Sequence, residues 1–285
     1  MTAPVRSWRD LAELVRAPAA LSVPGDVIAG AAAAGRLGPR TAGLAGASVL
    51  LYWAGMAAND WADRDLDAVE RPERPIPSGR IAPGTALGVA AGLTAAGVAV
   101  AGLAGGRRAL AVAAPLAGAV WAYDLGLKST PAGPAAMATC RALDVLLGAV
   151  GGRLRRAAWP AAVVFAHTYT VTALSRSEVD GATPALPKAT LVGTAAVAAS
   201  AAASRRALVP AALAGWYAYR YGAPQLAAVR NPDAARVRAS VGAGILNLPA
   251  LQGALTARAG RPLTGIAVAA VAPLARLLSR RVSPT

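Results

Sequence analysis

The stretch AANDWADRDLDAVERPERPIPSGRIAP, residues 57–83, lies between two long apolar runs and carries six of the 14 acidic residues of the chain. On a helix that turns about 100° per residue, four of its polar residues share one face. These four are Asn59, Asp60, Asp63 and Asp67, whereas Asp65 points elsewhere. Several oxygen ligands on one face suit Mg²⁺, which typically takes one or two carboxylates together with phosphate oxygens and water. The stretch therefore predicts a magnesium and diphosphate site, with a solvated charged loop as the alternative.

The apolar runs on both sides of this stretch predict a membrane protein. Of the 285 residues, 55% are hydrophobic, and the mean hydropathy is +0.45, a balance that soluble domains of this size do not normally have. Crossing about 30 Å of hydrocarbon takes roughly 20 apolar residues. Runs bounded by Gly, Pro and Arg predict spans at 19–37, 41–59, 83–103, 108–127, 131–151, 158–175, 186–203, 207–222 and 236–257, with a weaker tenth at 262–279.

We therefore expect an all-α, polytopic transmembrane bundle of about nine helices with a tenth C-terminal helix, forming a single domain over residues 1–285. The first 18 residues lack the order of a secretory signal. Residues 1–18 are instead expected to form an interfacial amphipathic helix, because their apolar residues recur at helical spacing. These apolar residues are Trp8, Leu11, Leu14 and Val15.

The charged residues exclude one class of partner and indicate where a site lies. The net charge is +15, but the arginines form short clusters between apolar runs, where they meet lipid headgroups. We therefore expect membrane lipids and no nucleic acid as partners. A dozen of the 14 acids fall at the span ends of one membrane face, which predicts a polar site there: Asp10, Glu13, those in residues 60–73, Asp124, Glu178, Asp180 and Asp233. The single cysteine, Cys140, excludes an internal disulfide.

Further candidate residues lie at span ends and inside spans. Lys128 closes the fourth span on the acidic face and is either a point charge for a diphosphate oxygen or a snorkelling lysine, with Tyr123 beside it. Arg141 and Asp144 share a face of the fifth span. Ionisable residues within a span usually face a cavity or each other, so this pair either neutralises itself or borders the pocket. The only histidine, His167, is expected to pack between helices.

Three short stretches resemble the UbiA prenyltransferase superfamily. Its first aspartate-rich motif, Asn-Asp-x-x-Asp-x-x-x-Asp, is matched over residues 59–67, and residues 74–80, Arg-Pro-Ile-Pro-Ser-Gly-Arg, are similar to its continuation. Residues 123–128 are similar to its Tyr-x-x-x-x-Lys element.

The sixth span departs from the superfamily pattern, which has a second aspartate-rich motif there. Thr168 and Ser175 stand where aspartates are expected, leaving Glu178 and Asp180 as the local carboxylates. The Ser-Arg-x-Glu ending of this span resembles the divergent EboC-like branch, as do residues 141–148.

This resemblance implies Mg²⁺-dependent transfer of a prenyl group from a prenyl diphosphate to an unidentified acceptor, which is aromatic, lipid or polar cyclic. Catalytic roles are expected for Asp60, Asp63, Asp67 and Lys128. Substrate and diphosphate contacts are expected from Asn59, Arg74, Arg80, Tyr123, Lys128, Arg141, Asp144 and Arg176. Metal ligands are expected among Asn59, Asp60, Asp63, Asp67, Glu178 and Asp180. The enzyme is expected in the plasma membrane, with its active site facing the cytoplasm.

Two other functions fit the same residues. A UbiA-type terpene cyclase would ionise the same diphosphate and quench the cation within the prenyl chain. A transporter or a structural membrane protein would use the acids as a coupling-ion site or as plain surface, although transporters usually place their sites near mid-membrane rather than at one interface.

Overall fold

Helices make up every regular element in the described part of the chain, residues 7–203 and 208–274 of the computed structural model. The α-helices are α1 (Trp8–Leu14), α2 (Val23–Ala33), α3 (Pro39–Ala62), α4 (Arg64–Glu70), α5 (Pro83–Leu125), α6 (Gly133–Gly148), α7 (Leu154–Ser175), α8 (Ala185–Ala202), α9 (Leu208–Arg230), α10 (Ala234–Arg258) and α11 (Pro262–Ala269). Short 3-10 helices cover Ala17–Ser22 and Leu127–Ser129.

Helix α5 consists of two antiparallel segments joined at Gly106. This residue has non-helical angles of φ 66° and ψ −159°, in the region that favours glycine. The indole Nε1 of Trp121 donates a hydrogen bond of 3.0 Å to Thr94 Oγ1, although 27 residues of straight helix would separate them by about 40 Å. The two spans expected at 83–103 and 108–127 are therefore the two arms of this hairpin.

The other expected spans also fall on helices, with shifted ends. Helix α9 runs on to Arg230, and the end of the expected 262–279 segment lies outside the described residues. Within residues 7–203 and 208–274, three helices are long and apolar enough to cross a membrane by length and composition, namely α3, α5 and α8. Others fall short because they are brief, like α2 and α6, or because they carry several polar side chains, like α10. The interior of the bundle, not lipid, surrounds these polar groups.

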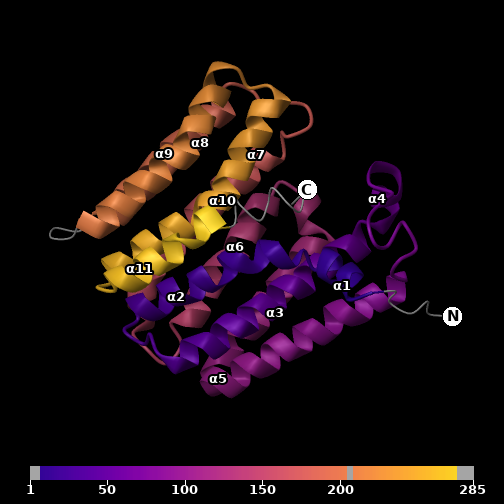
Figure 1. The fold of residues 1–285 in the computed structure, drawn as a ribbon, viewed down its shortest axis with the longest axis horizontal. Helices are drawn as coiled ribbons and strands as arrows, with labels where there is room; N and C mark the ends of the chain where they lie inside the picture. Colours follow the sequence, from indigo (N-terminus) through magenta and orange to yellow (C-terminus); the bar gives the residue numbers. More distant parts are fainter. Residues whose placement is uncertain (1–6, 204–207, 275–285) are drawn as a thin grey trace.

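Two halves of the bundle meet at α6. Figure 1 shows α1 to α5, coloured indigo to magenta, on one side and α8 to α11, coloured orange to yellow, on the other. Helices α2 and α6 approach so closely that a Cβ at Gly30 would overlap the Val145 carbonyl, and one at Gly148 would overlap the Val27 carbonyl. This contact of small residues is typical of membrane helix pairs, and it fixes the halves relative to each other.

The N-terminal segment covers one end of the first half. Helix α1 is shorter than the expected 1–18 helix, of which residues 1–6 lie outside the described part. Leu14 is fully buried while Trp8 is 74% exposed. After α1 the chain turns at Arg16, which has the left-handed angles φ 46° and ψ 51°. That turn directs the Arg16 side chain back toward the end of α3, where the acidic stretch begins.

Candidate functional site

The acidic stretch does not continue as one regular helix. Helix α3 ends at Ala62, and Asp63, with φ −90° and ψ 4°, is both its last cap and the first cap of α4. The backbone N–H of Asp67 still bonds the Asp63 carbonyl at 2.8 Å, so the chain bends without losing its hydrogen bonds. The expected single helical face is thus wrong in detail, but contacts to other elements still gather the four residues at one end of the bundle.

Arg74 joins the two most buried acids of the stretch. Its Nη1 lies 2.6 Å from Asp67 Oδ2 and 3.4 Å from Asp60 Oδ1. Arg16 Nη2 donates a second hydrogen bond to Asp60 Oδ1 at 2.8 Å. Both carboxylate side chains are about 95% buried, at 5% and 4% exposure. Buried charges of this kind persist only when paired, so the two arginines hold the carboxylates in place.

Asp63 and Asn59 contact residues at the end of α5 and just after it. Lys128 Nζ lies 2.7 Å from Asp63 Oδ1, with 20% and 26% of the two side chains exposed. Asn59 Nδ2 donates to the buried Asp124 at 3.3 Å, which leaves the Asn59 amide oxygen available to another partner. Tyr123 is half-buried next to Asp124. Residues at the ends of α3 and α5 thus meet as expected.

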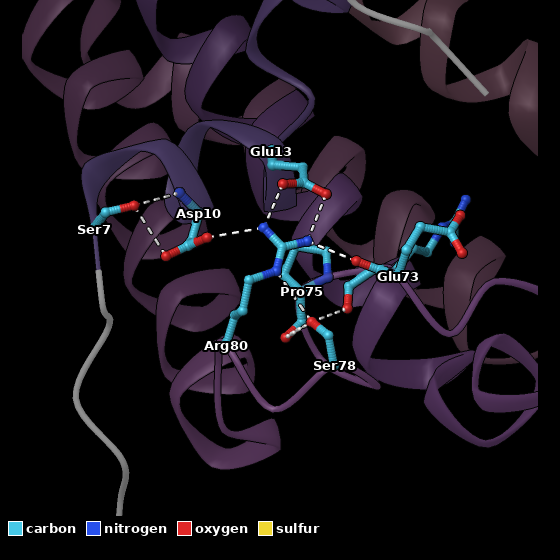
Figure 2. A network of polar contacts seen from close by, with 8 residues as sticks. Ser7, Asp10, Glu13, Glu73, Pro75, Ser78 and Arg80 are labelled. Atoms are coloured by element: carbon cyan, nitrogen blue, oxygen red, sulfur yellow. Dashed lines mark hydrogen bonds and ion pairs between the residues drawn. The ribbon is translucent and has the colours of Figure 1, made fainter.

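Arg80 lies in a different network (Figure 2). Its guanidinium contacts Asp10 Oδ1 at 2.8 Å and Glu13 Oε2 at 2.6 Å, and it donates to the Glu73 carbonyl at 2.6 Å. The hydrogen bond from Arg80 lowers the pKa of the Asp10 carboxyl below its ordinary value. Arg80 therefore connects α1 with the loop after α4. Its expected contact with diphosphate stays a prediction.

Arg141 and Asp144 have different partners. Arg141 Nε lies 2.8 Å from Asp26 Oδ2, and Gln252 Nε2 donates to Asp26 Oδ1 at 2.6 Å. Asp144 accepts a hydrogen bond from Ser48 instead. The neutralising partner of Arg141 is thus an acid of α2 rather than its neighbour on α6. All these groups lie deep in the bundle, where α2, α3, α6 and α10 meet.

The end of α7 supplies further charged residues to the same side. Arg176 Nη1 donates to the Thr130 carbonyl at 2.6 Å, next to the Lys128 segment. Glu178 is half-buried, and its carbonyl accepts from Arg238 at 3.3 Å. Burial raises the pKa of the Glu178 carboxyl, against the opposite effect of Arg238 and Arg71. Asp180 is exposed, so of the two expected ligands from this loop only Glu178 is partly enclosed.

The donor set fits a magnesium ion that is shared with a substrate. Among the described residues no group of three or more His, Cys, Asp or Glu side chains is arranged to hold a metal by itself. Mg²⁺ seldom needs such a cage, because phosphate oxygens and water complete its shell. Hard oxygen ligands of the required kind are offered by the carboxylates of Asp60, Asp63 and Asp67 and by the free amide oxygen of Asn59. Positive groups that can bind phosphate oxygens are offered by Arg16, Arg74 and Lys128.

Two residues of this region were not expected from the sequence. The sequence places Arg16 in the amphipathic helix expected over residues 1–18, whereas in the structure a left-handed turn at this residue brings its side chain to Asp60. Asp26 lies within an apolar run, and an intramembrane acid is by itself a signal of a functional or paired group. That signal was available in the sequence, whereas the turn at Arg16 was not.

The fold and the site together define a helical membrane protein with a charged, oxygen-rich site at one end of its bundle. The chain belongs to the UbiA prenyltransferase family, whose model matches residues 23–226. A solved structure of a UbiA homologue from Aeropyrum pernix K1, in its apo form, is 21% identical and has a TM-score of 0.61, covering 88% of this chain and 97% of that one. A second, from work on digeranylgeranylglyceryl phosphate synthase in membranes, has a TM-score of 0.65 at 15% identity, covering 88% and 98%. These two likenesses confirm the fold.

Similar curated proteins share shorter segments. The digeranylgeranylglyceryl phosphate synthase of Methanopyrus kandleri is 39% identical over 129 residues, 45% of this chain and 46% of that protein. The enzyme of the same name from Natronomonas pharaonis is 40% identical over 151 residues, 51% and 54% of the two chains. The chain spans about half the length of the curated relatives that it matches.

Proposed function

We propose that this protein is a membrane prenyltransferase that moves an isoprenyl group from a prenyl diphosphate to an acceptor, with Mg²⁺. The observation that carries the proposal is the meeting of three acids and three cations at the α3–α4 bend. Each acid has its own ion pair: Asp60 with Arg16, Asp63 with Lys128 and Asp67 with Arg74. Such a site offers both oxygen ligands for a divalent ion and positive groups for phosphate oxygens.

The side chains of the site suit the departure of a diphosphate. In the proposed reaction the bond between the prenyl C1 and the diphosphate oxygen breaks, and the electron pair leaves with the diphosphate. Positive groups that are already in place stabilise charge that develops on a leaving group without reorganisation. Arg74 is held by two carboxylates, and Lys128 by Asp63, so both are fixed before substrate arrives. The acceptor then forms the new bond to C1 and loses a proton.

A magnesium ion would be held by the oxygens of Asn59, Asp60, Asp63 and Asp67, with Glu178 and Asp180 as further candidates from the α7–α8 loop. When bound, it would supply Lewis-acid neutralisation of the diphosphate charge. The role of the chain is to offer these oxygens from the rigid end of α3 and to hold the arginines among them. We also propose that this end of the bundle faces the cytoplasm at the plasma membrane, which rests on the family resemblance.

The names of the relatives guide the first choice of acceptor. Digeranylgeranylglyceryl phosphate synthases, by their name, form a glyceryl phosphate that carries two geranylgeranyl groups, so geranylgeranylglyceryl phosphate is the first acceptor to test. Because these relatives match over about half their length, the acceptor of this chain is part of the proposal. Formation of a cyclised product without acceptor would favour the cyclase instead.

The test compares two acids of the same stretch. The purified protein in lipid nanodiscs is given labelled geranylgeranyl diphosphate and the acceptor, with Mg²⁺ or with a chelator. The variants are Asp63→Ala, which removes the partner of Lys128, and Asp65→Ala, whose carboxylate side chain is 88% exposed. Thermal unfolding is measured in parallel, since a bound ligand at roughly 100 times its dissociation constant adds about 2.7 kcal/mol of stability.

We expect Mg²⁺-dependent stabilisation by the diphosphate and product formation in the wild type and in Asp65→Ala, and neither in Asp63→Ala. Binding without turnover of any acceptor would retain the diphosphate site and redirect the search for the acceptor. No stabilisation of the wild type by any prenyl diphosphate would refute the proposal and favour a transporter or structural role.

A further inference from the structure

Three chain connections meet at the end of the bundle opposite the acidic stretch. They are the α2–α3 connection, the turn of α5 at Gly106 and the connection between α6 and α7. The backbone N–H of Arg153, at the end of the third, donates to the Ala34 carbonyl of the first at 3.1 Å. Helix α3 has 24 residues, so its start lies roughly 36 Å from its acidic end. In Figure 1 this end of the bundle lies away from α4.

This end carries arginines without acids. The segment before α3 and its first turn hold Arg36 and Arg40, the turn of α5 holds Arg107 and Arg108, and residues 153–156 hold three more. The segments 34–40, 104–108 and 149–156 contain no Asp or Glu, and all seven arginines are exposed. Every ion pair found within residues 7–203 and 208–274 uses other residues. Such a concentration of one charge attracts anions.

A cavity of about 420 Å³ opens among the three connections. Its lining includes Arg36, Gly38 and Arg40 next to the start of α3, Gly105 from the turn of α5, and Gly151. Two guanidinium groups, whose planar set of donors matches phosphate oxygens in pairs, therefore border one hollow. Its volume lies within the range of about 300 to 1,000 Å³ that is usual for small-molecule sites. A phosphate group and the glycerol that carries it would fit there.

Apolar surface adjoins these arginines. The cavity is also lined by Leu44, Ala104 and Val150. Outside it, Leu103 is 89% exposed and Leu154 is 50% exposed. Because α3 and α5 are long and apolar enough to span a membrane, their ends reach the level of the lipid headgroups. A ligand with an anionic head and apolar chains therefore matches this end better than a water-soluble anion, which would leave the leucines uncovered.

We propose that this cavity binds the headgroup of an anionic phospholipid, with Arg36 and Arg40 on its phosphate and its acyl chains on the apolar surface beside the turn of α5. The start of α3 adds to the attraction, because helix N-termini carry partial positive charge. The N-cap residue of α3 is Gly38, which has no side chain to bind the first N–H groups. The lipid site lies at the opposite end from the diphosphate site and does not depend on the proposed function.

Gly38 offers a matched pair of substitutions. Its φ of 178° is extended backbone, and a Cβ there would meet no described atom within 4 Å except the Arg36 carbonyl oxygen, at 3.9 Å. Asp and Asn are about equally good N-cap residues, so Gly38→Asp and Gly38→Asn should both fold. They differ in charge, and the new carboxylate would bind the arginines of the cavity and repel a phosphate. Arg155→Gln controls for net charge, because Arg155 is exposed at this end but does not line the cavity.

Native mass spectrometry of the full chain, released from a neutral detergent without Mg²⁺, gives the dissociation constant of each bound lipid. The lipids are phosphatidylglycerol and phosphatidylcholine with the same acyl chains, and inorganic phosphate is added as a competitor. The wild type, Gly38→Asn and Arg155→Gln should all bind phosphatidylglycerol with similar affinity and more tightly than phosphatidylcholine. Arg36→Gln and Arg40→Gln should each weaken phosphatidylglycerol binding about fivefold, and Gly38→Asp by about tenfold or more. Thermal unfolding without lipid checks that each variant is folded.

Three outcomes would overturn the inference. Equal affinity of the wild type for the two lipids would mean that the arginines do not select an anionic headgroup. Equal binding of phosphatidylglycerol by Gly38→Asp and Gly38→Asn would place the lipid elsewhere on the protein. Displacement of phosphatidylglycerol by an equal concentration of inorganic phosphate would assign the cavity to a soluble anion. None of these results bears on prenyl transfer, which is proposed for the acidic end.

Discussion

Replacing Arg74 with glutamine should cost more stability than any other single change of a charge in the 57–83 stretch. Arg74 is 12% exposed and contacts two carboxylates that are 5% and 4% exposed. Removing one partner of a buried ion pair typically costs about 3 to 5 kcal/mol, because the other charge stays buried and unpaired. Asp60 keeps Arg16 at 2.8 Å, so the unpaired charge is that of Asp67, and the loss should lie near the lower value, about 3 kcal/mol.

A second substitution tests this origin of the loss. In Arg74→Gln/Asp67→Asn the unpaired charge is gone and two amides can bond to each other, so most of the lost stability should return. The free energy of unfolding is measured by denaturant titration of the detergent-solubilised protein, for the wild type, both single variants and the double variant. The double variant should be folded yet no longer stabilised by prenyl diphosphate, because the cation is missing.

The control is Arg64→Gln. Arg64 pairs with Asp65 at 3.5 Å, where the two side chains are 37% and 88% exposed, and it also contacts the carbonyl and the ring of Trp61. Because its loss buries no unpaired charge, it should cost only about 1 kcal/mol. A cost for Arg74→Gln equal to that of Arg64→Gln would refute the argument from burial. So would a double variant that is no more stable than the single one.

Two further predictions concern packing and pH. Gly148→Ala should destabilise the protein by about 1 to 3 kcal/mol or more, because the new Cβ would overlap the Val27 carbonyl. Gly118→Ala is the control and should not destabilise it, because the space around Gly118 is open. Equal free energies of unfolding for the two variants would contradict this prediction. Because Arg80 lowers the pKa of Asp10, this ion pair stabilises the fold above the unfolded pKa and is lost as pH falls below about 4. Unfolding midpoints at pH 6 and pH 3 should therefore differ less in Asp10→Asn than in the wild type, and an unchanged difference would exclude the pair as the cause.

Much of the helical framework could be predicted from the sequence, because membrane spans have a simple physical signature. Apolar runs of the required length are bounded by Gly, Pro and Arg, and the expected spans at 83–103 and 108–127 are the two arms of the hairpin that turns at Gly106. The collection of acids on one face likewise indicated a common site, which stays a prediction; in the structure Arg74 joins Asp60 to Asp67, and Asp63 pairs with Lys128.

The partners of the charges could not be predicted in the same way. Arg74 and Arg80 stand six residues apart in one loop, and nothing in their sequence surroundings says that one joins the acids of the site and the other joins α1. Arg16 reaches Asp60 across 44 positions of chain, through a backbone turn that arginine rarely adopts. Long-range pairs of this kind depend on the packing of whole helices, which local spacing does not encode.

The charge balance of the site bears on how substrate and metal arrive. The three acids and three cations that meet at the α3–α4 bend nearly cancel, and the buried Asp124 adds a further acid close by. A diphosphate brings several negative charges into this nearly neutral place, where the low dielectric of the surroundings strengthens repulsion from the carboxylates. A divalent ion held by the oxygens of Asp60, Asp63 and Asp67 would supply the positive charge that offsets the diphosphate. The ion pairs of these acids with Arg16, Lys128 and Arg74 keep the three cations beside the carboxylates, in position for phosphate oxygens. On this reasoning the ion pairs hold both kinds of group in place before substrate arrives.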